Sequence, residues 1–501
     1  MEKLLEMFNS MLNSSGNTWL KEDEVFTQMK KLRLFKTDLI NCIKAKKIVC
    51  KTLDNKNYYT TLKFYRHEKI AAQNVVRILK EYVPPNISDE KLYECISNAE
   101  KKLGISLHEQ QREAVFGATK YGLYIITGGP GTGKTSVLQA LIDVLYQLKF
   151  DVEIRLTAPT GKAARRITES TKRMAKTIQK LLGLTETKKY PNKFLGDVLI
   201  VDEVSMLDME TTQAVLESIH NGRKLIFVGD IEQLPSVAPG AILRDMLESE
   251  VVPFTMLTKT FRQKAGSVLA ENIALIKNGN ANLLKGPDFE MIEIEDDPVS
   301  LLVDMFVEEA KEYGLYNIAL LLPYRKSGIL CSNYMNNVIQ KKINPSTNYF
   351  ESSLDNGSKV HYAVNDPVIQ LENRAECVNG DVGIIKEIKN NSLIVAYDDG
   401  KNMVEYEKEE IPQQLSLAYA LSINKSQGSE YPSVIMCISE THERMLNRNL
   451  LYTGVTRAKK KIRLLYDEMA LYKSIFNEET NKRTTLFAEE IKDEFERRKY
   501  E

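Results

Sequence analysis

The 501-residue sequence lacks an excess of charge of either sign. It holds 68 Lys and Arg against 68 Asp and Glu, so its formal net charge is zero. Such a balance excludes a global positive field that would attract nucleic acid, and it argues weakly against a nucleic-acid partner. A polynucleotide ligand would have to follow a local basic groove, which a large ATPase can hold between its domains.

Paired cysteines and long apolar runs are also missing. The six cysteines form no CxxC pair and are scattered along the chain, at Cys42, Cys50, Cys95, Cys331, Cys377 and Cys437. This spacing indicates reduced thiols without a zinc site. No apolar stretch reaches the roughly 18 residues of a membrane helix, and "MEKLLEMFNSMLNSSG" lacks a signal-peptide pattern. We expect a cytoplasmic protein with no membrane segment.

The first half of the chain divides into two patterns. Residues 1–100 are polar and largely helical, with a hairpin turning at Asp54–Lys56, which predicts a helical, winged-helix-like module. Residues 101–254 alternate helices with the apolar strands "GLYIIT", "EIRLTAP", "DVLIVDE" and "KLIFVGD". This alternation predicts a parallel sheet covered by helices on both faces.

The second half repeats the α/β pattern around a different segment. Residues 255–340 and 411–470 form a second α/β unit, with "NIALLLP" as a candidate strand. Residues 341–410 hold short strands with Asn, Gly and Asp turns, which predicts a small β-barrel inserted in that unit. We expect residues 471–501 to be a charged helix or tail with a solvated face.

One stretch carries a specific chemical signal. "ITGGPGTGKTSVLQALIDVL", residues 126–145, is an apolar strand, a glycine turn and an amphipathic helix. It fits G-x-x-x-x-G-K-[ST], whose backbone N–H groups surround phosphate oxygens at a helix N-terminus. Lys134 is expected to reach the β- and γ-phosphates, and Thr135 to ligate Mg²⁺. The predicted nucleotide-binding residues are Gly129, Pro130, Gly131, Thr132, Gly133, Lys134, Thr135 and Ser136.

Two later strands end in further polar groups. "LIVDEVSML" places Asp202 and Glu203 at the carboxyl edge of the sheet. Asp202 is expected to hold Mg²⁺, and Glu203 to orient and deprotonate the attacking water. Asp230 and Gln233 follow the next strand, where a side chain can sense the γ-phosphate.

These segments resemble, in order, the motifs of a superfamily 1 helicase, and more narrowly of the RecD-like 1B group. The resemblance spans about residues 105–465. The matching segments are "LHEQQREAV", "GGPGTGKT", "TAPTGKAARRI", "IVDEVSML", "VGDIEQLP", "LTKTFRQKAGS", "LAYALSINKSQGSEYPSVI" and "LLYTGVTRAKKKI". It implies two RecA-like parallel-sheet motor domains with ATP in the cleft between them, a small SH3-like β insertion and an N-terminal module.

The resemblance also assigns residues around the nucleotide. Gln111 is expected to read the adenine, Arg262 to contact the γ-phosphate and Arg457 to act as an arginine finger. Gly428 and Glu430, in the segment "SINKSQGSE", are expected to contact the nucleotide. We expect Phe261, next to Arg262, to pack in the core rather than to stack on a base.

Single-stranded DNA contacts are implied in two motifs. Hydroxyls, amides and lysines at strand ends suit phosphate binding without base readout. The implied DNA-binding residues are Pro159, Thr160, Lys162, Asn424, Lys425, Ser426 and Gln427. Asn424 stands where family members usually carry histidine, and we expect activity to survive this change.

Further segments match the place of known family features. Residues 183–196 match the β-hairpin "pin" that splits the duplex, and "VNGDVGII" resembles a phrase of the SH3-like insertion. We expect a short form without the long N-terminal extension of larger RecD-like helicases, and without a nuclease carboxylate cluster.

The sequence therefore predicts an ATP- and Mg²⁺-dependent DNA helicase or translocase for DNA repair or recombination, with 5′→3′ movement implied by the family. One alternative is an ATP-gated subunit that clamps DNA for a partner nuclease or defence complex and unwinds little alone. A small-molecule P-loop kinase is a third class, and it offers no reason for Gln111 or Arg457. RNA as the track stays open.

Overall fold

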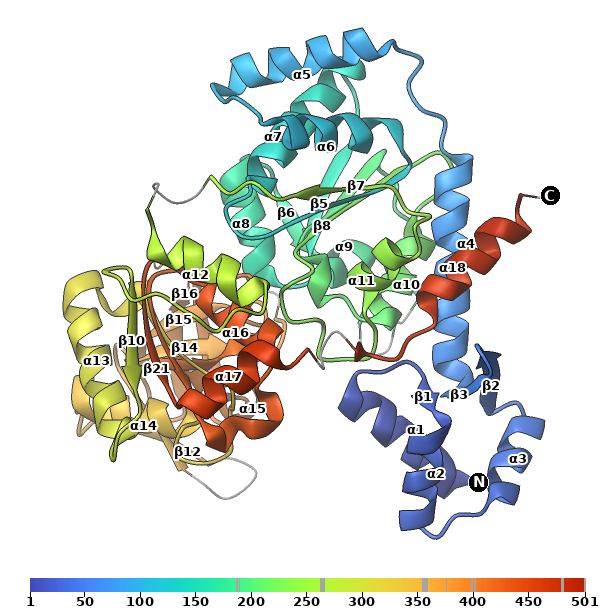
Figure 1. Ribbon diagram of the computed structural model, residues 1–501. Helices are drawn as coiled ribbons and strands as arrows, with labels where there is room; N and C mark the ends of the chain where they lie inside the picture. Colours follow the sequence, from blue (N-terminus) through green and yellow to red (C-terminus); the bar gives the residue numbers. More distant parts are fainter. Residues whose placement is uncertain are drawn as a thin grey trace. The chain divides into compact units, whose positions relative to one another are not determined.

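The computed structural model describes residues 1–185, 188, 190–261, 266–353, 359–374, 376–397, 400, 402–478 and 482–499. The chain divides into two compact units (Figure 1). Unit 1 comprises Met1–Pro159, Ile167–Arg262 and Glu479–Glu501, and unit 2 comprises Thr160–Arg166 and Gln263–Glu478. The chain therefore leaves unit 1 near residue 262 and returns to it after unit 2.

Unit 1 begins with a small α/β module. Helices α2 and α3 precede a hairpin of β2 and β3, in which Asp54 and Asn55 turn the chain at φ 47° and 60°. Leu4, Phe8 and Val25 belong to its own buried core. The elements are α1 (Glu2–Ser15), β1 (Leu20–Lys21), α2 (Glu22–Lys31), α3 (Lys36–Lys44), β2 (Ile48–Leu53) and β3 (Lys56–Thr61).

The rest of unit 1 surrounds a six-stranded sheet of order β6-β5-β7-β8-β4-β9, in which every pairing is parallel. Its elements are α4 (Leu62–Glu81), α5 (Asp89–Leu103), α6 (Glu109–Lys120), β4 (Leu123–Gly128), α7 (Lys134–Leu148), β5 (Ile154–Ala158), α8 (Gly161–Thr171), β6 (Ala175–Thr177), α9 (Ile178–Leu182), β7 (Val198–Val201), η1 (Val204–Met206), α10 (Met209–Ser218), β8 (Lys224–Gly229), α11 (Ile242–Glu248), β9 (Phe254–Leu257) and α18 (Phe487–Arg497).

Helices cover this sheet on both faces, as the alternating pattern predicts. Leu123, Leu199 and Phe227 share one core cluster with residues of α4, α10 and α18. The strands of this sheet are buried throughout β4, β7 and β8, which is typical of parallel sheets between helix layers. Burial on both faces explains why these strands read as continuous apolar runs.

The end of the chain is part of unit 1 rather than a solvated tail. Helix α18 runs along α4 (Figure 1) and also contacts α11. Its Phe487 and Ile491 are fully buried. The predicted charged helix forms and keeps a solvated face at Lys492, Asp493 and Glu496, while its apolar stripe packs on α4 and α11.

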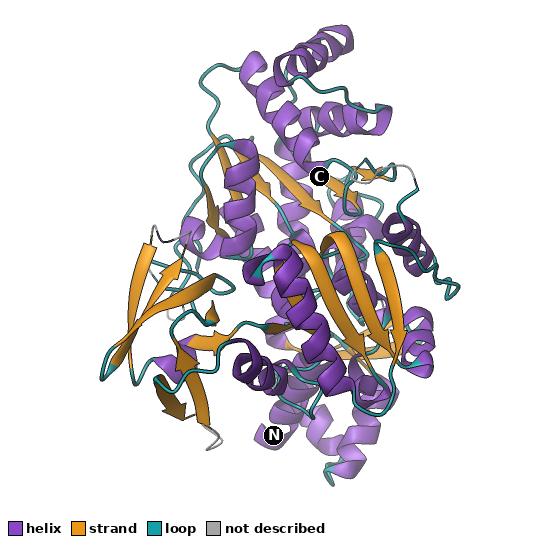
Figure 2. Ribbon diagram, turned by 90° about the vertical axis from the view of Figure 1, so that its left-hand side faces the viewer, coloured by secondary structure: helices purple, strands orange, loops and turns teal. Residues whose placement is uncertain are grey.

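Unit 2 holds a second parallel sheet, of order β10-β21-β20-β11-β19 (strands are orange in Figure 2). Its elements are α12 (Val268–Lys277), β10 (Phe289–Glu293), α13 (Pro298–Tyr313), β11 (Ile318–Leu322), α14 (Ser332–Ile343), β12 (Tyr349–Ser353), β13 (Lys359–Ala363), β14 (Pro367–Gln370), β15 (Val382–Ile388), β16 (Ser392–Tyr397), β17 (Asn402–Glu407), α15 (Ile411–Gln414), β18 (Leu415–Leu417), β19 (Ala420–Ser422), η4 (Ile423–Ser426), β20 (Tyr431–Ile438), α16 (Arg448–Val455), β21 (Ala458–Tyr466) and α17 (Glu468–Phe476).

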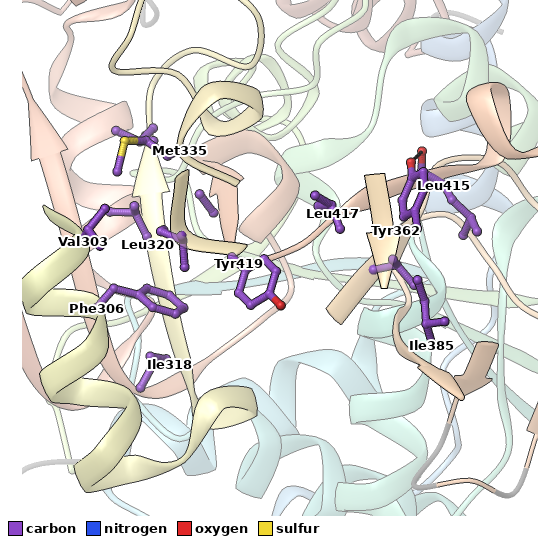
Figure 3. Packing of buried hydrophobic residues seen from close by; sticks show 14 of the residues in the cluster. Val303, Phe306, Ile318, Leu320, Met335, Tyr362, Ile385, Leu415, Leu417 and Tyr419 are labelled. Atoms are coloured by element: carbon purple, nitrogen blue, oxygen red, sulfur yellow. Dashed lines mark hydrogen bonds between the residues drawn. The ribbon is translucent and has the colours of Figure 1, made fainter. Parts of the chain in front are cut away.

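A small antiparallel sheet of order β17-β16-β15-β14-β18 is inserted in unit 2. One buried cluster runs from the parallel sheet into this insertion, from Phe306 and Leu320 through Tyr419 to Leu417 and Ile385 (Figure 3). The shared core means that the insertion is packed on unit 2 rather than tethered to it. The predicted α/β class, with two RecA-like sheets, a small β insertion and an N-terminal module, is confirmed.

The pin hairpin predicted at residues 183–196 stays a prediction. Residues 186, 187 and 189 lie outside the described residues, and the described part of 183–196 contains no strand. Within it, the Thr185 amide donates to the Lys188 carbonyl at 3.0 Å. Tyr190 and Leu195 are 83% and 80% exposed.

Candidate nucleotide and nucleic-acid sites

The glycine turn after β4 has the backbone of a phosphate-binding loop. Gly131 and Gly133 adopt φ 74° and 82°, a region that other residues rarely occupy. Gly133 is the N-cap of α7, so the free N–H groups of the first helical turn lie beside the loop. A Cβ on Gly128 would be 2.8 Å from the Leu257 carbonyl. The loop thus has room for phosphate oxygens only because glycines stand at these positions.

Lys134 and Gln111 lie against this loop. The Lys134 ammonium donates to the carbonyl of Gly129 at 2.9 Å and also to that of Gly128. The buried Gln111 amide donates from Nε2 to the Thr132 carbonyl at 2.9 Å, and its Oε1 accepts from the His108 amide. The predicted adenine reader therefore contacts the phosphate loop directly.

The predicted carboxylates lie at the same sheet edge as the loop. Asp202 follows β7, and its amide donates to the Thr157 carbonyl at 2.9 Å. Glu203 has φ 54°, and its amide donates to Asp202 Oδ1 at 2.8 Å. Because β4, β7 and β8 are parallel neighbours, the residues after each strand meet at one edge. Carboxylate and hydroxyl oxygens of Asp202 and Thr135 are ligands of the kind that Mg²⁺ prefers.

Asp230 and Gln233 follow β8 at that edge. Both are buried, at 1% and 6% exposure, and Gln233 Nε2 lies 3.4 Å from Asp230 Oδ2. Asp230 Oδ1 accepts from the Glu232 amide at 3.1 Å. The Asp230 carboxylate therefore fixes the turn that presents Gln233.

Segment 257–261 also borders the phosphate loop. The Phe261 amide donates to the Gly131 carbonyl at 2.7 Å, and its ring lies 6.2 Å from that of His108. Phe261 is 47% exposed, so the expectation that it packs in the core was wrong. Its backbone is held at the loop, which turns the ring outward. Arg262 lies outside the described residues.

Arg457 belongs to unit 2 and is 3% exposed. Its Nε donates to the Thr453 carbonyl at 2.9 Å, and its Nη1 donates to the Ser429 carbonyl at 3.2 Å. Carbonyls of α16 and of the segment between η4 and β20 thus fix the side chain within its own unit. Its predicted role toward ATP stays a prediction.

Gly428 and Glu430 follow η4 in unit 2. Gly428 adopts φ 73°, and a Cβ there would be 3.3 Å from the Ala163 Cβ. Glu430 pairs with Arg166 at 2.5 Å and with Lys459 at 3.4 Å. The carboxylate therefore serves an ion-pair cluster in this structure, and its proposed nucleotide contact is untested.

The predicted DNA-binding residues fall into two neighbouring stretches. Gly428 also approaches Thr160 Oγ1, so the start of α8 and the η4 segment lie side by side in unit 2. Lys162 lies 5.0 Å from the centre of the Tyr431 ring. The stretches hold Thr160 and Lys162 on one side and Asn424, Lys425, Ser426 and Gln427 on the other; Pro159 precedes them at the edge of unit 1.

Lys425 is partly buried among residues of unit 2. Burial lowers the pKa of Lys425, and the nearby charge of Arg325 lowers it further. Its ammonium donates to Asn379 Oδ1 at 2.8 Å, in the inserted sheet's 378–381 turn. Arg165 pairs with Asp381 of the same turn at 2.8 Å. Sequence reasoning missed this turn as a neighbour of the predicted DNA contacts, because the links span 46 residues from Lys425 to Asn379 and 216 from Arg165 to Asp381.

A parallel sheet with a phosphate loop after one strand and carboxylates after its neighbours defines a RecA-type P-loop nucleotide-binding protein. Two family models match the chain, an AAA domain over residues 106–293 and a UvrD-like helicase C-terminal domain over residues 417–465. The chain is 33% identical over 369 residues to the ATP-dependent RecD2 DNA helicase of Deinococcus radiodurans, covering 72% of this chain and 49% of that protein. It thus spans about half the length of that relative.

Other relatives are covered more fully. The RecBCD enzyme subunit RecD of Mycobacterium tuberculosis is 27% identical over 464 residues, which cover 82% of this chain and 77% of that protein. The solved Pif1 helicase from Bacteroides in complex with ADP-AlF3 and ssDNA matches at 20% identity and TM-score 0.47, covering 72% of this chain and 92% of that one. The chain is thus a homologue of RecD and RecD2 helicases, at 27–33% identity over most of its length.

Gly133→Ala is expected to weaken nucleotide binding by roughly tenfold or more, since a non-glycine residue at positive φ costs about 1–2 kcal/mol. The added Cβ would also lie 2.2 Å from Gln111 Nε2. Titration with a fluorescent ATP analogue measures the effect. Gly222→Ala is the matched control, because Gly222 has φ 74° with no atom within 4 Å of the added Cβ. Equal affinities of the two variants would contradict the assignment.

Proposed function

We propose that this protein is an ATP-dependent DNA helicase that moves along single-stranded DNA. The observation that carries the proposal is the phosphate loop of Gly128–Thr135 beside Asp202, at the carboxyl edge of a parallel sheet, in a homologue of RecD and RecD2 helicases. This arrangement binds a nucleoside triphosphate. The relatives include a protein named as an ATP-dependent DNA helicase.

The roles of the nucleotide-site residues follow from their chemistry. Gly129–Gly133 and Ser136 present backbone N–H groups to the phosphates, and Lys134 neutralises their charge. Thr135 and Asp202 hold Mg²⁺, which shields the phosphate oxygens when bound. Glu203 accepts a proton from the attacking water.

Further residues act around the triphosphate. Gln233 senses the γ-phosphate, Gln111 reads the base, and Arg262 and Arg457 supply positive charge as hydrolysis proceeds. Gly428 and Glu430 also contact the nucleotide. Because the Glu430 carboxylate also pairs with Arg166 at 2.5 Å, it connects the nucleotide to that arginine.

The DNA strand is proposed to lie on Pro159, Thr160, Lys162 and the Asn424–Gln427 stretch. Contacts to phosphates and stacking without base readout suit a motor that tolerates any sequence. Segment 183–196, with exposed Tyr190 and Leu195, is proposed to separate the strands of the duplex ahead of the motor. We propose movement in the 5′→3′ direction, a role in DNA repair or recombination, and a cytoplasmic location. None of the helices in the described residues is long and apolar enough to span a bilayer.

A strand-displacement assay tests this function. The protein, ATP and Mg²⁺ are mixed with duplexes that carry a 5′ tail, a 3′ tail or a fork, and with a 5′-tailed RNA duplex. We expect opening of the 5′-tailed and forked DNA duplexes and ATP hydrolysis that rises with single-stranded DNA. Opening of the 3′-tailed duplex alone would reverse the proposed polarity. An absence of both DNA-stimulated hydrolysis and opening would refute the proposal.

A second candidate function is an ATP-gated DNA clamp that works within a nuclease or defence complex. The similarity to RecBCD enzyme subunits RecD favours it, because their name places them in a multi-subunit enzyme. This candidate predicts strong stimulation of ATP hydrolysis by single-stranded DNA without duplex opening. Opening by the purified chain alone would exclude it.

A further inference from the structure

Arg483, which precedes α18, binds a turn that follows the nucleotide-site strand β8. Its Nη2 donates to the Ser236 carbonyl at 2.6 Å. Its Nη1 donates to the Gly240 carbonyl at 2.7 Å and the Ala238 carbonyl at 3.2 Å, and it lies 3.4 Å from Ser236 Oγ. One guanidinium thus closes the turn 236–240, and Val237 at its tip is 77% exposed.

The same guanidinium lies over the end of α1. Gly16 has φ 73°, and a Cβ on it would be 2.5 Å from Arg483 Cζ. The Gly16 carbonyl accepts from the Gly240 amide at 3.0 Å, and the Thr484 carbonyl accepts from the Thr18 amide at 3.1 Å. The N-terminal module, the turn and the segment before α18 therefore meet at Arg483.

Charge strengthens these contacts. Burial lowers the pKa of Arg483 to about 10, with a smaller effect from Arg244, so the group stays cationic at neutral pH. Arg244 donates to the Arg483 carbonyl at 3.0 Å and pairs with the buried Asp245 at 2.7 Å. Bonds from a cation to carbonyls are stronger than bonds between neutral groups.

The turn joins two regions that the proposed function uses. It begins three residues after Gln233, the predicted γ-phosphate sensor. Ala238 and Pro239 line a cleft of about 490 Å³ together with Leu184 and Lys188, at the base of segment 183–196. If turn 236–240 is rigid, a displacement of Gln233 therefore also displaces the base of segment 183–196.

We infer that Arg483 is a positioning residue that locks turn 236–240, so that changes at Gln233 are transmitted to segment 183–196. The inference rests on the proposed function and adds a residue outside its motifs. It assigns to the segment before α18 a role in coupling ATP hydrolysis to strand separation.

The test measures base pairs opened per ATP hydrolysed. Arg483→Ala is expected to lower this ratio roughly tenfold, the size of effect that follows the loss of charge-assisted bonds, while DNA-stimulated ATP hydrolysis stays within about twofold. Arg483→Lys should restore part of the ratio, because it retains the charge. A merely structural role would lower hydrolysis and opening together and leave their ratio unchanged, which would overturn the inference.

A second pair of variants tests the same contact by changing Gly16, the residue against which Arg483 lies. Gly16→Ala should displace Arg483 and reproduce the lowered ratio. Gly104→Ala is the matched control, because Gly104 also ends a helix at positive φ but has no atom within 4 Å of the added Cβ. Combining Gly16→Ala with Arg483→Ala should add little to either alone. Additive effects would contradict a shared contact.

Amide hydrogen exchange keeps the two proposals separable. Exchange at Gly240 should rise in Arg483→Ala whether or not the wild-type protein opens DNA. Unchanged exchange there would overturn the inference even if helicase activity is found. If the wild-type protein opens no duplex and exchange at Gly240 still rises in Arg483→Ala, only the proposed function is rejected.

Discussion

Lys134→Ala is expected to abolish ATP turnover. Lys134 is the first residue of α7, and its ammonium already lies against the Gly128 and Gly129 carbonyls of the phosphate loop. Without it, the β- and γ-phosphate charge loses its side-chain partner at the loop. Removal of one preorganised charge-stabilising group typically costs roughly 10²–10³ in kcat. Release of inorganic phosphate, with and without single-stranded DNA, measures the loss.

Lys149→Ala is the matched control for this variant. Lys149 follows the other end of the same helix and makes an exposed ion pair with Asp197 at 3.2 Å. Exposed pairs contribute little to stability, so this variant should retain full hydrolysis. Normal turnover by Lys134→Ala, in protein that melts like the wild type, would defeat the assignment of the nucleotide site.

Arg457→Ala should lower hydrolysis by about 10³–10⁵-fold while nucleotide binding remains measurable. An arginine finger acts on charge that develops as the phosphoryl group leaves, so its loss falls on kcat rather than on ATP affinity. Single-turnover hydrolysis and titration with a fluorescent ATP analogue separate the two quantities. Equal losses of binding and hydrolysis would argue against a finger.

The Arg457 test needs a structural control because the side chain is buried among carbonyls of its own unit. Arg463→Ala serves this purpose. Arg463 lies on β21, the strand that follows Arg457, and pairs with Glu290 and Glu308 at 2.7 Å each. Its loss therefore perturbs a neighbouring part of unit 2 without a predicted role toward ATP. If both variants lose hydrolysis to the same degree, the effect of Arg457→Ala is one of stability.

Local sequence signals predicted the parts of the molecule that short-range physics determines. The glycines of 128–133 require particular backbone angles, and the apolar runs that end at Asp202 and Asp230 form buried parallel strands. The turn at Asp54–Lys56 follows from the tolerance of Asp and Asn for positive φ. These features need no information from distant parts of the chain.

Other features depend on contacts across long sequence separations. The charged pattern of α18 predicts an amphipathic helix but does not identify α4 as its partner. Phe261 is apolar, yet its amide is bound to Gly131, which keeps the ring half exposed. Arg483 stands in a polar stretch, where a single arginine carries no signal. For the same reason the roles assigned to Arg262 and Arg457 rest on family resemblance.

The return of the chain to unit 1 has a consequence for its biosynthesis. Helix α18 leaves the ribosome only after all of unit 2 has been made, yet Phe487 and Ile491 complete the layer that covers α4. Until then, the nascent first motor sheet exposes the apolar surface that these two side chains later bury. Exposed apolar surface of this kind is what chaperones recognise, so the order of synthesis delays completion of unit 1 until unit 2 has been made.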